Sequence, residues 1–557
     1  MGYSPVVSRP QAGVWLIGPA ADLLFGCGLL YILIFLALAS FGESLRAAQP
    51  VFLMPVLLML VSLPHYGATL VRVYEERADR RRYAIFAVWA TLAVLGVFVV
   101  SIYDATVASI FLTLYLTWSP WHYTGQNYGL SVMFLRRAGV SLETGLKRWL
   151  YASFVLSYAL VFLSFHKEAG PGVPQFNAAL GGGTAIAFWP IGIPQHIADS
   201  IFTVAVSAYA LALGVCAVVL LRRAPAKQLA PAALLVLTQA LWFSIPIAFR
   251  LAGSPTSLTG ADLYAGGVLD WVALGHAAQY LWVTSFYARS STRWHGTAAY
   301  FGKVAVAGIA IWTVPVLLFG PDFFGPLSST AAVAMLIATA VNVHHFILDG
   351  AIWKLRDGRI ASVLLRNAPE QAVVSPARSW LRRGVWATAA AWVALYLVGT
   401  LELAVRRGRD PVDLAGMRDA IARLRWLGLD DPATRVQLGI DAGTHGDVAG
   451  ARREFMRSLQ LQESARGWVG LAHAEFHEGR REQAHAALMR AVNTEPDDPE
   501  TWSQASDVWA ALGDAKRARG ALVRAVALAP ERDELAQRLS QLEAGGASSP
   551  GGSSTLP

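Results

Sequence analysis

The stretch VNVHHFILDGAIWKLRDGR, residues 341–359, carries two adjacent histidines and an aspartate from an apolar run into a basic segment. An apolar run of about 17–25 residues is long enough to cross a bilayer as an α-helix. Ionisable side chains inside such a run are rare, because their burial in lipid is unfavourable, and they mark functional positions. The stretch therefore predicts a membrane helix that contributes to a polar site.

The composition of the whole chain fits a membrane protein. Of its 557 residues, 55% are hydrophobic and 15% are charged, which is too apolar for a soluble protein of this size. The net charge is +8, but the basic residues cluster at the ends of apolar runs. This pattern indicates membrane topology rather than nucleic-acid binding. Cys27 and Cys216 both lie in apolar runs, so no disulfide framework is expected.

We expect about eleven spans, beginning near residues 21, 51, 84, 106, 150, 199, 229, 265, 303, 329 and 383. Basic residues follow every second span, and the positive-inside rule then places the N-terminus in the cytoplasm of a bacterial inner membrane. Eleven crossings put the C-terminal part outside, in the periplasm of a Gram-negative cell. The Gly- and Pro-rich segment 170–195 is expected to be a loop at the membrane interface.

The C-terminal part contains an internal repeat. SARGWVGLAHAEFHEGRREQAHAALMRAVNTEP (464–496) aligns with PETWSQASDVWAALGDAKRARGALVRAVALAP (499–530). Trp468 then matches Trp502 and Gly479 matches Gly513, each pair 34 residues apart, and a weaker copy precedes them around Gly446. The period and the small residues resemble the tetratricopeptide repeat, a helix–turn–helix unit. That resemblance implies a short solenoid that binds a protein or peptide partner.

The fold class expected from these patterns is all-α, a polytopic transmembrane bundle followed by a short soluble helical solenoid. The membrane domain is expected over 1–405, a linker helix over 406–429, the repeat domain over 430–543 and a disordered tail over 544–557.

Histidines lie at a similar depth in four of the predicted spans. They are His65, His122, His276 and the adjacent pair His344 and His345. They precede the next basic residue by 7, 14, 13 and 9 to 10 residues, or roughly 10–21 Å along a helix. Neutral imidazole is a good ligand for iron, zinc or copper. We therefore expect a shared metal site, with iron first, and another transition metal, haem or a proton relay as alternatives.

Polar and aromatic side chains surround these histidines in the sequence. Those one helical turn away are expected to hold the ring tautomers: Thr69 for His65, Gln126 for His122, Gln279 and Tyr280 for His276, and Asp349 for His345. The aromatic residues expected to line an apolar substrate pocket are Tyr66, Trp121, Tyr123, Tyr280 and Trp282. Asp349 is expected to orient a ligand rather than act as a base. His166, His196 and His295 are placed in loops, outside the site.

The histidine motifs resemble, in sequence order, those of the Brp/Blh-like membrane family. They are PHYGA (64–68), HYTGQ (122–126), HAAQYLWV (276–283) and HHFILD (344–349). The family contains the bacterial β-carotene dioxygenases, all-helical membrane proteins in which histidine-ligated iron cleaves a polyene with O₂. The resemblance implies iron ligation by His65, His122 and His276, with His344 close by. The chain departs from the family at Tyr280, where a second histidine is usual, and in its histidine pair and repeat domain, which leaves a carotenoid substrate open.

Three functions remain in competition. The first is a metal-dependent membrane oxygenase that acts on a membrane lipid or a lipophilic small molecule. The second is a non-enzymatic scaffold or transporter whose repeats recruit a partner. The third, a membrane glycosyltransferase, needs acidic residues in an early outside loop, where the chain offers only Glu43 and Asp104.

Overall fold

The computed structural model describes residues 13–48, 53–75, 77–168, 173–174, 176–181, 184–244, 268–290, 294–320, 323, 331–368, 379–409 and 411–545. Residues 544 and 545 of the tail expected over 544–557 are helical, and its remaining residues, 546–557, lie outside the described part. The chain is all-α, as the sequence predicts, apart from one small two-stranded sheet in the described part. It forms two compact units. The first comprises Met1–Asn177, Ala187–Trp312 and Ile337–Val393, and the second comprises Ala178–Ile186, Thr313–Leu336 and Ala394–Pro557.

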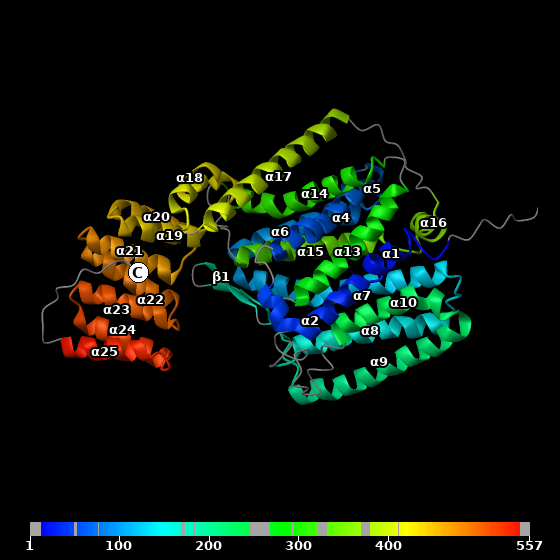
Figure 1. Ribbon diagram of the computed structural model, residues 1–557, viewed down its shortest axis with the longest axis horizontal. Helices are drawn as coiled ribbons and strands as arrows, with labels where there is room; N and C mark the ends of the chain where they lie inside the picture. Colours follow the sequence, from blue (N-terminus) through cyan, green and yellow to red (C-terminus); the bar gives the residue numbers. More distant parts are fainter. Residues whose placement is uncertain are drawn as a thin grey trace, which may run out of the picture. The chain divides into compact units, whose positions relative to one another are not determined.

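The first unit is a bundle of helices (Figure 1). Its described helices are α1 (Pro19–Ala21), α2 (Leu29–Ala48), α3 (Leu53–Leu57), α4 (Leu63–Tyr74), α5 (Arg77–Arg82), α6 (Thr91–Tyr103), α7 (Ala105–Arg137), α8 (Thr144–His166), α9 (Gln195–Arg223), α10 (Ala226–Gln239), α13 (Val268–Arg289) and α16 (Gly358–Arg366). Helices α14 (Thr297–Leu318), α15 (Ala331–Ile352) and α17 (Ser379–Arg407) contribute to both units. Helix α8 packs beside α9, and α7 packs beside α10.

Six helices in the described part are long and apolar enough to cross a membrane. They are Ile85–Tyr103, Thr144–His166, Gln195–Arg223, Thr297–Leu318, Ala332–Ile352 and Trp380–Arg407. A seventh candidate is the pair Pro19–Gly26 and Leu29–Ala37, which is bent by 56°. Helices α4, α7, α10 and α13 occupy the regions of the other four predicted spans, which begin near 51, 106, 229 and 265. Residues 51, 265 and 329 themselves lie outside the described part, and a total of eleven spans stays a prediction.

The segment 170–195 differs in part from the expected interfacial loop. Asn177–Gly181 (β1) pairs with Thr184–Ala187 (β2) in a two-stranded sheet. Strand β2, TAIA, directly follows the glycine run, and its Thr184 and Ile186 are β-branched residues that favour strands, so a short sheet forms where Gly and Pro clusters had indicated irregular structure.

The end of α7 is tied to two distant parts of the chain by Arg137, which is 5% exposed. Its guanidinium donates to the backbone oxygens of Val14 at 3.0 Å, Trp15 at 2.6 Å and Leu364 at 2.8 Å. A buried guanidinium is stable only when such acceptors surround it. The N-terminal segment and α16 are therefore both fixed to the same end of α7.

The second unit contains a row of short helices. They are α18 (Leu414–Leu424), a 3₁₀ turn (Arg425–Leu427), α19 (Pro432–Thr444), α20 (Val448–Leu461), α21 (Ala465–His477), α22 (Arg481–Thr494), α23 (Pro499–Ala511), α24 (Ala515–Leu528) and α25 (Asp533–Gly545). Neighbouring helices pack in chain order from α19 to α25. Gly479 and Gly513 occupy the same turn of successive helix pairs, with φ of 80° and 82°. Glycine adopts this left-handed conformation without strain.

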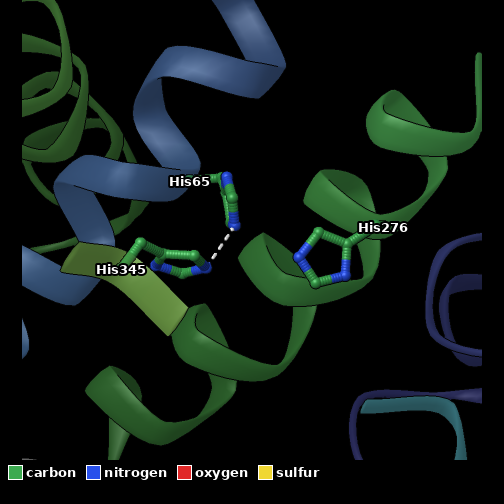
Figure 2. A group of neighbouring side chains, drawn as sticks. All are labelled: His65, His276 and His345. Carbon is green, nitrogen blue, oxygen red and sulfur yellow. Dashed lines mark hydrogen bonds between the residues drawn. The ribbon is translucent and has the colours of Figure 1, made fainter. Parts of the chain in front are cut away.

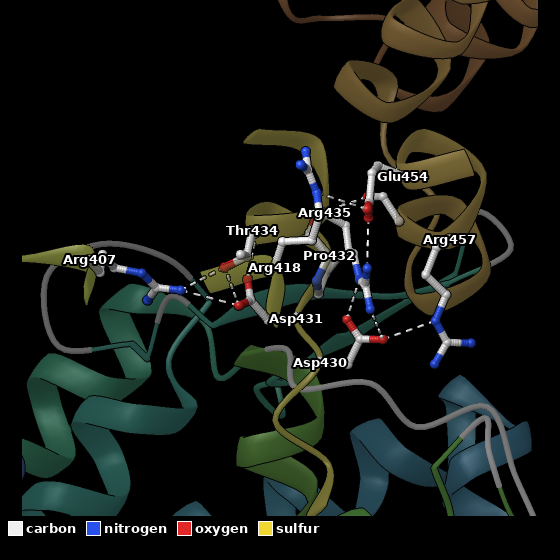
Figure 3. Close-up of polar contacts among 10 residues, drawn as sticks. Arg407, Arg418, Asp430, Asp431, Pro432, Thr434, Arg435, Glu454 and Arg457 are labelled. Atoms are coloured by element: carbon white, nitrogen blue, oxygen red, sulfur yellow. Dashed lines mark hydrogen bonds and ion pairs between the residues drawn. The ribbon is translucent and has the colours of Figure 1, made fainter. Parts of the chain in front are cut away.

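An ion-pair network joins α19 to α20 (Figure 3). Asp430 is 4% exposed. Its carboxylate accepts hydrogen bonds from Arg435 Nε at 2.6 Å and from Arg457 Nε at 2.9 Å. Arg435 also donates to Glu454 at 2.7 Å. One buried carboxylate thus balances two arginines from successive helices.

Replacing Asp430 with alanine should destabilise this helix pair by about 3 kcal/mol, because two guanidinium groups lose their shared buried acceptor. Hydrogen exchange of residues 432–461 in the full-length protein measures the loss as faster exchange. The matched control is Asp419→Ala on α18, where the aspartate is exposed and a change within about 0.5 kcal/mol is expected. Equal exchange in the two variants would show that the network contributes little.

Candidate metal centre

Four helices bring His65, His122, His276 and His345 together inside the first unit. Helix α4 carries His65, α7 carries His122, α13 carries His276 and α15 carries His345. The His65 ring centroid lies 4.3 Å from that of His345 and 5.0 Å from that of His276. The His122 ring lies 4.9 Å from His276 and 5.0 Å from His345. Figure 2 shows three of these rings pointing toward one another.

The donor atoms have the spacing that a metal requires. Within the described residues, the ligand atoms of His65, His276 and His345 lie within 4.8 Å of one another, as do those of His122, His345 and Asp349. His65 Nε2 and His345 Nε2 are 2.9 Å apart. Two nitrogens bound at about 2.1 Å and at a right angle are about 3.0 Å apart, so this distance fits adjacent ligands of one ion.

Several of these nitrogens have no hydrogen-bond partner among the described residues. His276 is 1% exposed, and both its Nδ1 and its Nε2 lack a partner. The same holds for His65 Nδ1 and His122 Nε2. Buried polar atoms are normally satisfied, because leaving one unpaired is unfavourable. A bound metal ion would satisfy Nε2 of His122 and one nitrogen of His276, so the residues present fit such an ion.

A hydrogen-bond network fixes His345 and Asp349. Thr69 Oγ1 lies 2.9 Å from His345 Nδ1 and donates to Asp349 Oδ1 at 3.2 Å. The Tyr280 hydroxyl donates to the same carboxylate oxygen at 2.6 Å. If His345 Nδ1 carries the proton and donates it to Thr69, Nε2 keeps its lone pair for the metal. Thr69 is therefore a hydrogen-bond partner of His345 and not of His65, which lies on the same helix as Thr69. This corrects the expected pairing.

Asp349 lies beside the nitrogens of two histidines, but too far from them to orient either ring through a hydrogen bond. Its Oδ2 is 3.6 Å from His345 Nε2 and 3.8 Å from His122 Nε2. The carboxylate is thus in position to be a ligand itself. With His122 and His345 it forms a set of two histidines and one carboxylate, which is typical of non-haem iron(II) oxygenases.

His344 lies outside this group of donors, which corrects its inclusion among the expected ligands. Its Nε2 is 3.1 Å from the Tyr74 hydroxyl and 3.0 Å from Thr91 Oγ1. Adjacent residues on an α-helix point about 100° apart, so only one of the two neighbours can face the other three histidines. In this structure that residue is His345.

Gln126 and Gln279 join α7 to α13 rather than binding imidazole nitrogens. Gln126 Nε2 donates to Gln279 Oε1 at 3.0 Å and to the backbone oxygen of His276 at 3.2 Å. The two glutamines therefore hold the helix that carries His276 at a fixed distance from α7. The expected contact of each amide with an imidazole ring is not formed.

The aromatic residues expected beside the site have different surroundings in the structure. The Tyr66 ring lies 4.4 Å from His65, and the Tyr123 ring lies 4.3 Å from His276. Trp121 is 37% exposed and packs on Tyr158 at 5.2 Å. Trp282 instead donates its indole N–H to Asp22 at 3.0 Å, away from the histidines, and is corrected to a structural residue.

Two residues near the site were not predicted from the sequence. Trp353 donates from its indole nitrogen to the Tyr280 hydroxyl at 3.0 Å, and Asn342 accepts a hydrogen bond from Tyr66 at 2.9 Å. Trp353 lies one helical turn after Asp349, and a search of both neighbouring turns would have found it. Of the histidines predicted in loops, His166 ends α8 and His196 lies in the first turn of α9. Both residues border the Gly- and Pro-rich segment between them, which is why neither position looked helical.

A cavity of about 340 Å³ reaches the site from one side. His122, Tyr280 and Asp349 form part of its wall, together with Trp121 and Trp353. Ligand pockets of this size are usually apolar with a few polar groups that orient the ligand. The cavity gives a small molecule access to the donors.

No family model matches the chain, and no curated protein matches it significantly.

Proposed function

We propose that the chain is an integral-membrane oxygenase whose metal, iron, is held by His65, His122, His276 and His345, with Asp349 as a further ligand. Its substrate is a lipophilic molecule that reaches the site from the bilayer. One observation carries this proposal: five donors from four helices converge, and several of their buried nitrogens have no partner in the described part of the chain.

The protein's own residues place and protect the ion. Thr69 and Tyr280 hold His345 and Asp349 in one orientation through hydrogen bonds of 2.6 to 3.2 Å. Tyr66 and Tyr123 pack against the histidine rings and exclude water from that side. When bound, iron supplies the activation of O₂ that no side chain provides. The cavity wall then positions the substrate beside it.

Haem fits this arrangement less well than a bare ion. Axial nitrogens on opposite sides of one iron lie about 4 Å apart, given metal–nitrogen distances of about 2 Å. His65 Nε2 and His345 Nε2 are 2.9 Å apart, too close to hold a porphyrin between them.

Protein purified in detergent should contain stoichiometric iron and show no Soret band, because the donor set matches a bare transition metal. Elemental analysis combined with an absorption spectrum measures both. Protein that stays metal-free even after anaerobic reconstitution with Fe(II) would support the scaffold or transporter alternative instead.

The glycosyltransferase alternative loses one of its two acidic candidates. Asp104 caps α7, where its carboxylate accepts from the backbone N–H groups of Thr106 at 2.8 Å and Val107 at 3.2 Å. N-capping is an ordinary structural role for aspartate. A metal and sugar-phosphate site is therefore not favoured there.

We further propose that helices α19 to α25 form a tetratricopeptide array that binds a protein or peptide. The recurring left-handed glycines Gly446, Gly479 and Gly513 and the packing of successive helices support it. The distribution of basic residues supports a cytoplasmic N-terminus in a bacterial inner membrane and a periplasmic array. Protease accessibility from either side of sealed vesicles tests this orientation.

A further inference from the structure

The cavity beside the histidines extends along one side of α7. Its wall on this helix begins at Trp118, passes His122 and Gly129, and ends at Met133. The distance from Trp118 to Met133 is about 22 Å at 1.5 Å per residue. Residues of α15 and α16 form the opposite wall, including Phe346 and Leu364. The space is therefore a groove much longer than a single small molecule such as O₂ needs.

Glycines keep the groove open. Gly125 and Gly129 lie one turn apart on α7, and Gly350 faces them from α15. A Cβ atom built at any of the three would meet no atom within 4 Å. Glycine lowers helix stability by about 1 kcal/mol relative to alanine. Neither close helix packing nor a turn requires glycine at these three positions, and a larger side chain there would enter the groove.

The two ends of the groove differ in polarity. The polar lining residues His122, Gln126, Tyr280 and Asp349 lie in the half of the groove that begins at Trp118. The His122 side chain is 10% exposed, and its Nε2 has no hydrogen-bond partner within the described ranges. The other end is lined by apolar side chains, namely Leu130, Met133, Ile360 and Leu364. A ligand that matches this wall has a reacting end near the histidines and an apolar tail along α7.

We propose that the groove binds an unbranched hydrocarbon chain, and that Gly125 and Gly129 determine this specificity by leaving no side chain in its path. The inference rests on the proposed oxygenase and names the substrate class of the same site. A linear chain is narrow enough to lie along α7 where Gly125 and Gly129 carry no side chain. A fused-ring molecule is wider than the space that these two glycines leave. The apolar tail lies toward Met133 and the carbon to be oxidised lies beside His122.

Photo-crosslinking of the full-length protein in lipid nanodiscs tests the proposal. The probes are an unbranched fatty alcohol that carries a diazirine in its chain and a sterol diazirine. Mass spectrometry locates the adducts. The linear probe should label the α7 peptide over 118–133, and the sterol, which partitions into the same bilayer, should not. In Gly129→Leu, labelling of this peptide by the linear probe should fall about tenfold, equivalent to about 1.4 kcal/mol of binding.

The matched control is Gly96→Leu, since Gly96 is also a helical glycine whose added Cβ would meet nothing within 4 Å, but lies outside the groove. Labelling should be unchanged there. Equal labelling by the sterol, or full labelling of Gly129→Leu, would overturn the proposal. Metal content is measured on the same samples. Labelling of the groove in protein without metal would refute the oxygenase proposal and support the hydrocarbon-binding groove. Bound metal without labelling of the groove would support the oxygenase proposal and refute the hydrocarbon-binding groove.

Discussion

Replacing His276 with alanine should give protein that inserts into the membrane but retains no iron. The imidazole is 1% exposed, both its nitrogens lack hydrogen-bond partners among the described residues, and its ring touches those of His65 and His122. Loss of a residue that only orients a metal ligand weakens metal binding by about 10–100-fold. Removal of a ligand itself should exceed the upper end of that range. Elemental analysis after size-exclusion chromatography measures the result.

His344→Ala is the matched control for this experiment. His344 is also a buried histidine in a candidate membrane span, and it directly precedes a proposed ligand, but its ring nitrogen lies within hydrogen-bond distance of Tyr74 and Thr91. This variant should keep its iron. If His276→Ala retained as much metal as His344→Ala, the four histidines would have to be packing residues, and the oxygenase proposal would fail.

A single methyl group at Gly67 should destabilise the first unit by about 3 kcal/mol and reduce its metal content. A Cβ at Gly67 would lie 1.8 Å from the backbone oxygen of Val304 on α14. In the reverse direction, a Cβ at Gly308 would lie 1.9 Å from the backbone oxygen of Leu63. The backbones of α4 and α14 are in direct contact, so neither neighbour can give way by rotating a side chain. Small residues allow this close approach of membrane helices.

The expected result follows because His65 lies two residues before Gly67. Helices forced apart by Gly67→Ala would carry His65 away from His345, from which its Nε2 is now 2.9 Å distant. The midpoint of thermal unfolding and the iron content should fall together. Gly96→Ala adds a methyl group to open space and should change neither. A stable Gly67→Ala protein with full iron would show that α4 and α14 can separate without disturbing the site.

The sequence predicts which helices meet at the site better than it predicts the contacts within it. The similar distance of each histidine from a basic flank indicated a common depth, and the structure does bring together His65, His122, His276 and one residue of the pair. The choice between His344 and His345 depends on the rotation of α15 about its axis. That rotation is set by packing against other helices, which periodicity within α15 does not reveal.

The same limit explains the pairing of Thr69. A residue one turn from a histidine on its own helix is the partner that a sequence pattern can find. In the bundle, α4 crosses α15 closely enough for Thr69 Oγ1 to reach His345 Nδ1 at 2.9 Å. The all-α class was predictable from long apolar runs and the 34-residue repeat. The hairpin of β1 and β2 was not, because its strands are too short to show a clear alternation.

The separation of His65 and His345 along the chain has a consequence for biogenesis. The two residues are 280 positions apart, and α15 is the last of the four contributing helices to leave the ribosome. Until then the imidazoles of α4, α7 and α13 lack the ligand that belongs to both donor groups. In the proposed oxygenase, the ion can therefore be loaded only after nearly the whole first unit has been translated. A truncated chain that stops before α15 would be inserted by the translocon yet remain unable to mature.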